Sequence, residues 1–270
     1  MYGSESTTVS RCSLVVRTTD IWTGRPAAPS SLLVRLKGGC SAPMRTSEGS
    51  WAFLDLKSDT YEITVESAIY MSCSRKIDLS SLQANNPVVD IFLLPGKRYS
   101  PPAAATGIVR RLVDPDGKPL PNVEVVAYAD DDQAARGRIL DEESSMGSGI
   151  LRCLPGASAP KNGDALAVRG HNGSAAEWFR VQPFEDEEGM CLRPDRPLAG
   201  LWKRNALLLP AAATVSDRDG WIVLPFRGRI AAAGEVRVRL RDGERTAESQ
   251  WSLKDGQTIV LPDFVWQPGG

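Results

Sequence analysis

The chain has a single histidine, His171, among its 270 residues. Ser/His/Asp catalysis and the common transition-metal sites both depend on histidine as a base or a ligand. His171 precedes Asn172 and Gly173, a dipeptide typical of a tight hairpin turn, so we expect it to be a solvated turn residue. The sequence therefore predicts no catalytic residues, no metal ligands and no cofactor, and we expect the protein not to be an enzyme.

Long hydrophobic runs and an excess of one charge are also missing. No stretch approaches the ~18 apolar residues of a membrane span, and the N-terminus lacks a basic segment followed by an apolar one. The sequence as written thus predicts a cytoplasmic protein without a membrane span. An extracellular or assembly-associated location stays open if a signal was removed or a larger machine carries the protein. The 32 basic and 33 acidic residues give no electrostatic footprint for nucleic acid.

The cysteines are few, odd in number and widely spaced, at positions 12, 40, 73, 153 and 191. Without a CxxC pair or a Cys/His cluster, the spacing argues against a zinc site. We expect buried free thiols in a reducing compartment, with a disulfide between Cys153 and Cys191 as the alternative.

The most informative stretch is residues 106–128, TGIVRRLVDPDGKPLPNVEVVAY. Its central DPDG is a turn, because Pro115 presets φ for the second turn position and Gly117 accepts positive φ. β-Branched residues precede the turn, and Val123, Val125 and Ala127 alternate with other residues after it. The stretch therefore predicts strand, turn and strand.

The same alternation recurs along the chain, and no stretch has sustained helical periodicity. Strands are expected at residues 13–19, 31–37, 51–56, 61–66, 69–77 and 88–94, with 51–56 and 61–66 forming a hairpin. About seven short strands separated by turns are typical of an antiparallel β-sandwich. The predicted fold class is all-β.

Three later segments repeat the character of earlier ones in the same order, which indicates an internal duplication. Residues 219–224 match 48–54, residues 234–240 match 59–65, and residues 258–262 match 90–95. The predicted organisation is a flexible tail (1–8), a first β-sandwich (9–95), a proline-rich linker (96–105) and a second β-sandwich (106–266). The second sandwich carries an insertion at about residues 130–212.

The insertion is expected to hold ordered β-structure and loops on one side of the second sandwich. Strands at 165–169 and 176–181 flank the Asn172-Gly173 turn, and residues 206–209 are apolar. Because the two copies differ most here, the insertion is the first candidate for a partner-binding surface. The candidate residues are Trp178, Phe179, Trp202, Glu185, Asp186, Glu187 and Glu188. Burial of the aromatic residues against the second sandwich is the alternative.

Other charged clusters have simple interpretations. The acidic runs 130–132 and 185–188 could offer oxygen ligands to calcium, but neither has the spacing of a dedicated calcium loop, which favours solvated loops. The stripe of Arg237, Arg239 and Arg241 reads as the solvent face of a strand.

These turn motifs resemble the transthyretin-like, carboxypeptidase-regulatory-like β-sandwich family. The matching positions are Asp114, Asp116, Gly117, Pro119, Leu120 and Val123, then Asp217, Asp219, Gly220 and Trp221, then Gly234, Val236, Val238 and Leu240. The first module fits less tightly, with Asp20, Gly24 and Pro26. The resemblance implies two Ig-like (transthyretin-like) sandwich domains. Intradiol dioxygenases and hydroxyisourate hydrolases share parts of this pattern but need several histidines.

The duplication, the short linker, the missing catalytic residues and the missing signal favour a non-enzymatic structural or protein-interaction module. We expect an adaptor or accessory component of a larger bacterial assembly, such as a phage-tail-like or secretion apparatus, with protein partners and no nucleic acid. One alternative is a glycan-binding or adhesin module of an exported protein, with the aromatic residues of the insertion stacking on sugar. The other is a metal-dependent enzyme, which the single histidine disfavours.

Overall fold

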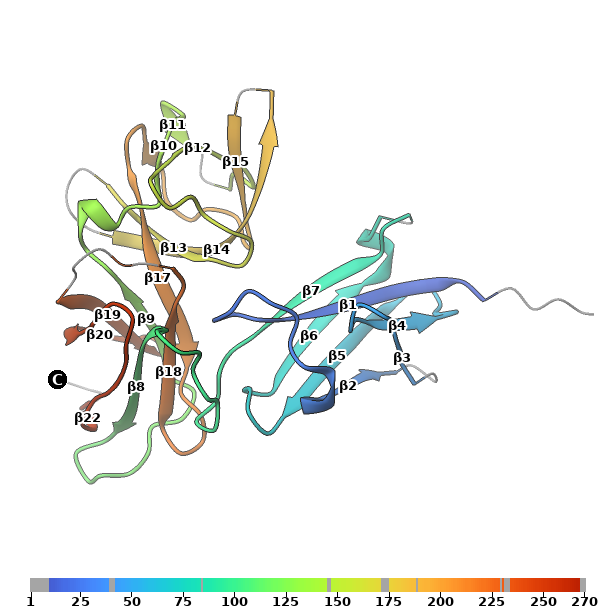
Figure 1. Cartoon of the computed structure of the whole chain (residues 1–270), viewed down its shortest axis with the longest axis horizontal. Coiled ribbons are helices and arrows are strands. Elements are labelled where there is room, and N and C mark those ends of the chain that lie inside the picture. The colour runs from blue at the N-terminus through green and yellow to red at the C-terminus, as the bar shows by residue number, and fades with distance from the viewer. Residues whose placement is uncertain are drawn as a thin grey trace, which may run out of the picture. The chain divides into compact units, whose positions relative to one another are not determined.

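The computed structural model describes residues 10–38, 42–83, 85–144, 147–170, 175–187, 189–228, 230 and 234–267. Its regular structure is all β-strand apart from three short 3-10 turns, so the all-β prediction is confirmed (Figure 1). The chain divides into two compact units, Met1–Asp20 with Arg25–Leu93 and Ile21–Gly24 with Leu94–Gly270. No helix in the described ranges is long and apolar enough to cross a membrane.

The first unit holds two sheets with the strand orders β3-β4-β1-β7 and β2-β5-β6. Their strands are β1 (Cys12–Asp20), β2 (Leu32–Lys37), β3 (Met44–Arg45), β4 (Trp51–Leu54), β5 (Thr60–Ser67), β6 (Cys73–Asp78) and β7 (Val88–Leu93). The 3-10 turns are η1 (Pro29–Ser31) and η2 (Leu79–Ser81). Alternate residues are buried along β2 and β5, as a sheet with one solvated face requires.

The predicted hairpin of residues 51–56 and 61–66 is wrong. β4 pairs with β1 and β3, whereas β5 pairs with β2 and β6. The end of β4 is tied to the start of β1, because Asp55 N–H donates to the Arg11 carbonyl (2.9 Å) and Asp55 Oδ1 accepts from Arg11 N–H (2.8 Å). The alternation of apolar and polar residues along β4 and β5 would be the same whether these strands paired with each other or with other strands. The two-residue period of the sequence therefore could not show which strands pair.

The strand predicted at 69–77 begins only at Cys73. The Ser67 hydroxyl accepts hydrogen bonds from the N–H groups of Ile69 and Tyr70, each at 3.2 Å, and this makes a turn directly after β5. Tyr70 is buried there, and its hydroxyl donates to Asp20 Oδ2 at 3.0 Å.

The second unit repeats the pairing order of the first. β8 pairs antiparallel with β18 and parallel with β21, as β1 pairs with β4 and β7. β9, β19 and β20 lie in sequence within one sheet, as β2, β5 and β6 do. The strands are β8 (Thr106–Val113), β9 (Glu124–Tyr128), β18 (Trp221–Phe226), β19 (Glu235–Asp242), β20 (Arg245–Ser252), β21 (Thr258–Val260) and β22 (Phe264–Val265). The three matched sequence segments fall on equivalent strands, β4 and β18, β5 and β19, and β7 and β21.

Two turns of the second unit share one geometry. Asp114 Oδ1 accepts from the N–H groups of Asp116 (2.9 Å) and Lys118 (2.8 Å), and Asp217 Oδ1 accepts from Asp219 (2.9 Å) and Trp221 (2.8 Å). Each turn contains a glycine in the left-handed region, at φ 78° for Gly117 and 79° for Gly220. The DPDG motif and its DRDG counterpart thus use the aspartate side chain in the same way.

These two glycines give a matched test. A Cβ at Gly220 would lie 2.4 Å from the backbone oxygen of Leu112, whereas a Cβ at Gly117 would meet nothing within 4 Å. Both alanine variants carry the cost of positive φ, but only Gly220→Ala also forces the backbone apart. We expect Gly220→Ala to lower the free energy of unfolding by about 1–3 kcal/mol more than Gly117→Ala does, as measured by urea denaturation. Equal losses would contradict the close approach at Gly220.

The insertion forms a closed barrel. Its strands are β10 (Gly137–Ile139), β12 (Leu151–Pro155), β13 (Ala165–Arg169), β14 (Ala175–Asp186) and β15 (Gly189–Pro194), closed by β17 (Leu207–Val215). The order β10-β12-β15-β14-β13-β17 returns to its start because β10 also pairs with β17, and every neighbour in the ring is antiparallel. β11 (Glu143–Ser144) pairs with β16 (Trp202–Lys203) outside the ring, and η3 (Asp132–Ala134) precedes it. β-Structure was expected here, but closure was not.

β17 belongs to both parts of the second unit (Figure 1). Residues 207–211 pair with β13, and residues 211–215 pair with β9. Eight of its nine residues are buried, in the order LLLPAAATV. This continuous apolar run is what a strand covered on both faces requires. The nine-stranded sheet therefore runs without a break from the barrel to β20.

Candidate binding groove

The structure separates the three aromatic candidates of the insertion. Phe179 is fully buried and Trp202 is 8% exposed, and both belong to the barrel core with Leu166, Val168 and Leu208. Trp178 points to the other side of β14, because successive residues of a strand face opposite ways. It packs against a second apolar cluster outside the barrel, which includes Tyr128, Ala167 and Leu209.

The acidic candidates lie at the β14–β15 hairpin, away from Trp178. Glu185, Asp186 and Glu187 are exposed, and Glu188 lies outside the described residues. Asp186 Oδ2 accepts from the Cys191 thiol (3.1 Å) and lies 4.0 Å from Arg152 Nε. The predicted surface is therefore not one patch: only Trp178 of the aromatic candidates is partly exposed.

The other acidic run, 130–132, pairs with arginines. Asp130 is within 2.5 Å of an Arg169 nitrogen and 2.7 Å of Arg237 Nε, and Asp132 also contacts Arg169. Asp131 caps η3 by accepting from Gln133 N–H at 2.9 Å. Among the residues that the structure describes, no group of three or more His, Cys, Asp or Glu side chains could hold a metal ion.

Cys153 and Cys191 are free, buried thiols on opposite faces of the barrel wall. Leu151 pairs with Leu192 and Arg152 with Cys191, so Cys153 faces inward with Leu151 while Cys191 faces outward with Arg152. The disulfide alternative is therefore contradicted. Burial raises the pKa of Cys153 to about 11.

The other cysteines differ in exposure. Cys12 is exposed, against expectation, because the strand register shifts between it and Leu14, and Cys73 is half-buried. Cys40, His171 and the turn at Asn172 lie outside the described residues.

A groove lies over the sheet where the barrel meets β9 and β19. Its volume is about 290 Å³, and its floor is formed by Val126, Tyr128 and Ala167. One wall is formed by Trp178, Arg196, Pro197 and Ala199, and the other by Arg239 and Arg241. Small residues pair with both rings here: Ala211 of β17 lies opposite Tyr128, and Ala167 of β13 lies opposite Trp178. A second hollow of about 310 Å³ adjoins it over β19 and β20 and shares Tyr128 and Arg239.

Glu177 holds one wall of the groove in place. Its carboxylate accepts from the N–H groups of Ala199 (2.6 Å) and Gly200 (3.1 Å) and from Trp202 Nε1 (2.9 Å). Arg196 stacks on Trp178 with its guanidinium carbon 4.2 Å from the ring centroid, and its Nη2 donates to the Trp178 carbonyl (2.5 Å). The wall is thus anchored to the barrel core through Trp202. The Arg196 guanidinium covers the face of the Trp178 ring on which a sugar would stack, which disfavours the glycan-binding alternative.

Paired charges lie at the adjoining hollow, which Arg237, Arg239 and Glu248 line. Arg237 pairs with Asp130 (2.7 Å), and Arg239 pairs with Glu248 (3.2 Å). Burial raises the pKa of the Tyr128 hydroxyl, an effect that nearby Arg237 opposes. Sequence reasoning placed Arg237, Arg239 and Arg241 on a solvent face but missed that Trp178 closes the other side. The sequence did hold one indication of this arrangement. Adjacent residues of a strand, such as Trp178 and Phe179, cannot both face the core, so one of the two rings had to lie outside the barrel.

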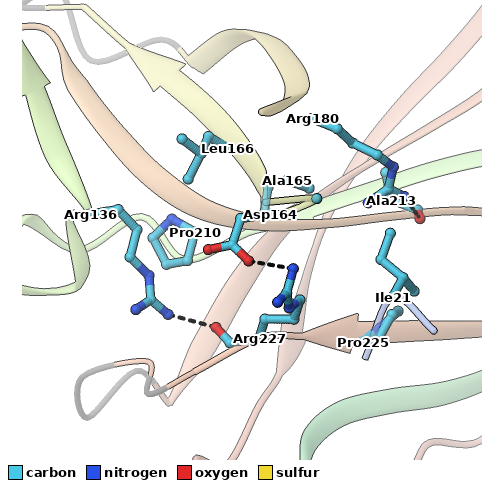
Figure 2. Close-up of a pocket in the computed structure, with 12 residues that line it drawn as sticks. Ile21, Arg136, Asp164, Ala165, Leu166, Arg180, Pro210, Ala213, Pro225 and Arg227 are labelled. Carbon is cyan, nitrogen blue, oxygen red and sulfur yellow. Dashed lines mark hydrogen bonds and ion pairs between the residues drawn. The ribbon is translucent and has the colours of Figure 1, made fainter. Parts of the chain in front are cut away.

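A buried charge cluster joins the barrel to β18 within the second unit (Figure 2). Asp164, 8% exposed, forms an ion pair with Arg227 Nη1 at 2.8 Å and accepts from Lys161 N–H at 2.9 Å. Arg136 Nη2 donates to the Arg227 carbonyl (2.6 Å), and Arg180 donates to the Ala213 carbonyl (3.2 Å). Burial lowers the pKa of Arg180 to about 10. The space between these groups is only about 10 Å³, so the cluster is a structural junction and has no room for a ligand larger than water.

Asp164 gives a pH dependence of unusual sign. Burial raises its pKa despite the attraction of Arg227. Because the folded-state pKa lies above the unfolded value, its contribution to stability is full below the unfolded pKa and is lost as pH rises through the folded pKa. In urea denaturation between pH 7 and pH 4, we expect the wild type to gain stability relative to Asp164→Asn as pH falls. A difference that stays constant or reverses would contradict this prediction.

Comparison with known proteins shows no family for this chain. No protein-family model matches it, and no curated protein matches it significantly. Among solved structures, it aligns with the Bacillus anthracis TIE protein at 9% identity and a TM-score of 0.25, over 96% of this chain and 50% of that one. It aligns with a streptococcal ancillary pilin at 10% identity and a TM-score of 0.19, over 94% of this chain and 98% of that one. The chain thus spans half the length of the TIE protein, and neither alignment is close enough to assign a fold or a function.

Proposed function

We propose that this chain is a non-enzymatic protein-interaction module, an adaptor or accessory component of a larger bacterial assembly, and that the groove is its binding face. In this proposal two transthyretin-like β-sandwich domains, joined by residues 96–105, arose by duplication. The second domain acquired the barrel as an addition. The recurring strand pairings of the two units support the duplication.

The observation that carries the proposal is a hollow lined by tryptophan and arginine over the nine-stranded sheet. Trp, Tyr and Arg are enriched at the energetic centres of protein interfaces. Here Trp178, Tyr128 and Arg239 lie on paired strands and line the same groove. The described lining holds no Ser, Cys, His or Lys that could act as a nucleophile or base, and Glu177 is committed to three hydrogen bonds. Glu124 and Tyr128 also line the groove, and in our proposal they serve binding.

Site-specific photo-crosslinking in the native cells tests the proposal. A photoreactive amino acid at Ala199, on the groove wall, is expected to give a discrete adduct with a protein partner. The same residue at Leu33, 45% exposed on the first unit, is the matched control. The adduct from Ala199 should be lost when Arg239 and Arg241 are changed to glutamate and kept in Arg35→Glu. No adduct, or one equally strong from Leu33, would refute the groove as the binding face.

A further inference from the structure

Two of the groove's arginines have no carboxylate partner within the part of the chain that the structure describes. Arg196 donates to the Trp178 carbonyl, and Arg241 Nε donates to the Gly243 carbonyl at 3.0 Å. Among the described residues, neither forms an ion pair with an aspartate or glutamate, unlike Arg237 and Arg239. A guanidinium has five N–H donors in a fixed fork that fits a carboxylate. Most donors of Arg196 and Arg241 therefore remain for a ligand, and the two side chains belong to opposite walls of one groove.

The acidic side chains near these arginines are mostly committed elsewhere. Glu177 holds the wall, Asp130 binds Arg169 and Arg237, and Glu248 binds Arg239. Glu124 is the exception: it lies opposite Arg241 in the strand register, yet the two form no ion pair in the described structure. Because Glu124 does not pair with Arg241, a carboxylate of a ligand could form an ion pair with this arginine.

The floor between the arginines is apolar. Val126, Tyr128 and Ala167 form it, and Tyr128 and Ala167 belong with Trp178 of the wall to the apolar cluster outside the barrel. The volume of about 290 Å³ is at the small end of ligand sites. It suits one or two side chains of an extended segment and cannot take a folded element.

From these features we propose that the groove binds a short segment of a partner protein in which a carboxylate stands beside an apolar side chain. The carboxylate lies between Arg196 and Arg241, and the apolar side chain rests on Val126 and Ala167. This inference rests on the proposed binding function and names the chemistry of its partner. A polyanion such as heparin or nucleic acid fits less well, because Glu124, Asp130 and Glu248 would repel a dense row of negative charge.

The probe is a random dodecapeptide library displayed on phage and selected on the full chain. Selected peptides are expected to place Asp or Glu next to Leu, Ile, Phe or Trp. A synthetic selected peptide should lose about tenfold in affinity when its acid is changed to the amide, as expected for a hydrogen bond to a charged group. Arg196→Ala and Arg241→Ala should each weaken binding similarly, while Arg35→Ala on the first unit should not. Both groove arginines are exposed, so their loss should leave the fold intact.

The Glu124→Gln variant tests whether the groove arginines bind the acid of the peptide or only support the fold. Removing this negative charge beside Arg241 should tighten binding of the acidic peptide and leave its amide counterpart unchanged. Selection of neutral or basic peptides, or binding that ignores Arg196 and Arg241, would overturn the inference. So would binding of heparin fragments or single-stranded DNA that depends on these arginines while no peptide binds. If crosslinking from Ala199 still captures a partner in such cases, the proposed function stands and only the ligand chemistry fails; if crosslinking fails as well, both fall.

Discussion

Phe179→Ala is expected to lower the free energy of unfolding of the second unit by about 3–5 kcal/mol. Phe179 is among the largest fully buried side chains and fills the barrel core next to Leu166, its cross-strand neighbour. Removing the ring deletes apolar contacts and leaves a cavity that a closed ring of six strands cannot collapse to fill. Urea denaturation followed by tryptophan fluorescence measures the loss.

The adjacent residue is the matched control. Trp178→Ala removes a larger side chain from the same strand, but that side chain lies on the groove rather than in the barrel core. We expect it to cost clearly less stability than Phe179→Ala and to abolish crosslinking from Ala199. If both variants lost the same stability, the assignment of the two rings to opposite faces of β14 would be wrong.

Arg227→Ala is expected to cost about 3–5 kcal/mol, because it leaves the Asp164 carboxylate buried without its ion pair. Removing both partners should be less harmful than the sum of the single losses, since no isolated charge then remains. The measurement is a double-mutant cycle of Arg227→Ala and Asp164→Ala by urea denaturation.

An exposed ion pair serves as the comparison for this cycle. Lys118 lies 3.9 Å from Asp116, and both side chains are about three-quarters exposed, at 75% and 78%. Lys118→Ala should therefore change stability by less than about 1 kcal/mol. Strict additivity in the Arg227–Asp164 cycle would show that the buried pair does not act as a unit.

Local chemistry explains what could be predicted from the sequence. The turns at Asp114 and Asp217 were recognisable because each aspartate binds N–H groups two and four residues ahead, all within one short motif. The strands could be predicted because apolar and polar residues alternate along them, and this alternation indicates which side chains face a core. Alternation does not record which strand pairs with which, and so the 51–66 hairpin was predicted where β4 and β5 lie in different sheets.

The barrel and the groove depend on contacts that no local pattern reveals. β10 has only three residues, and its pairing with Leu207 and Leu208 of β17 spans about seventy positions of sequence. Arg196 follows no motif, and it reaches Trp178 only because the barrel brings the end of β15 beside β14. Trp178 and Phe179 were predicted to share one surface because they are adjacent in sequence. Successive residues of a strand face opposite sides of the sheet, so the two rings belong to different clusters.

The shared strand β17 has a consequence for biosynthesis. β9 leaves the ribosome some eighty residues before β17, which must pair with it. At about 5–20 residues per second, this edge of β9 waits roughly 4–16 seconds, while the whole barrel is being made, before its neighbour exists. During synthesis the barrel is therefore made before the second sandwich can be completed. A chain that stalls within the barrel therefore leaves this edge of β9 unpaired and open to other proteins.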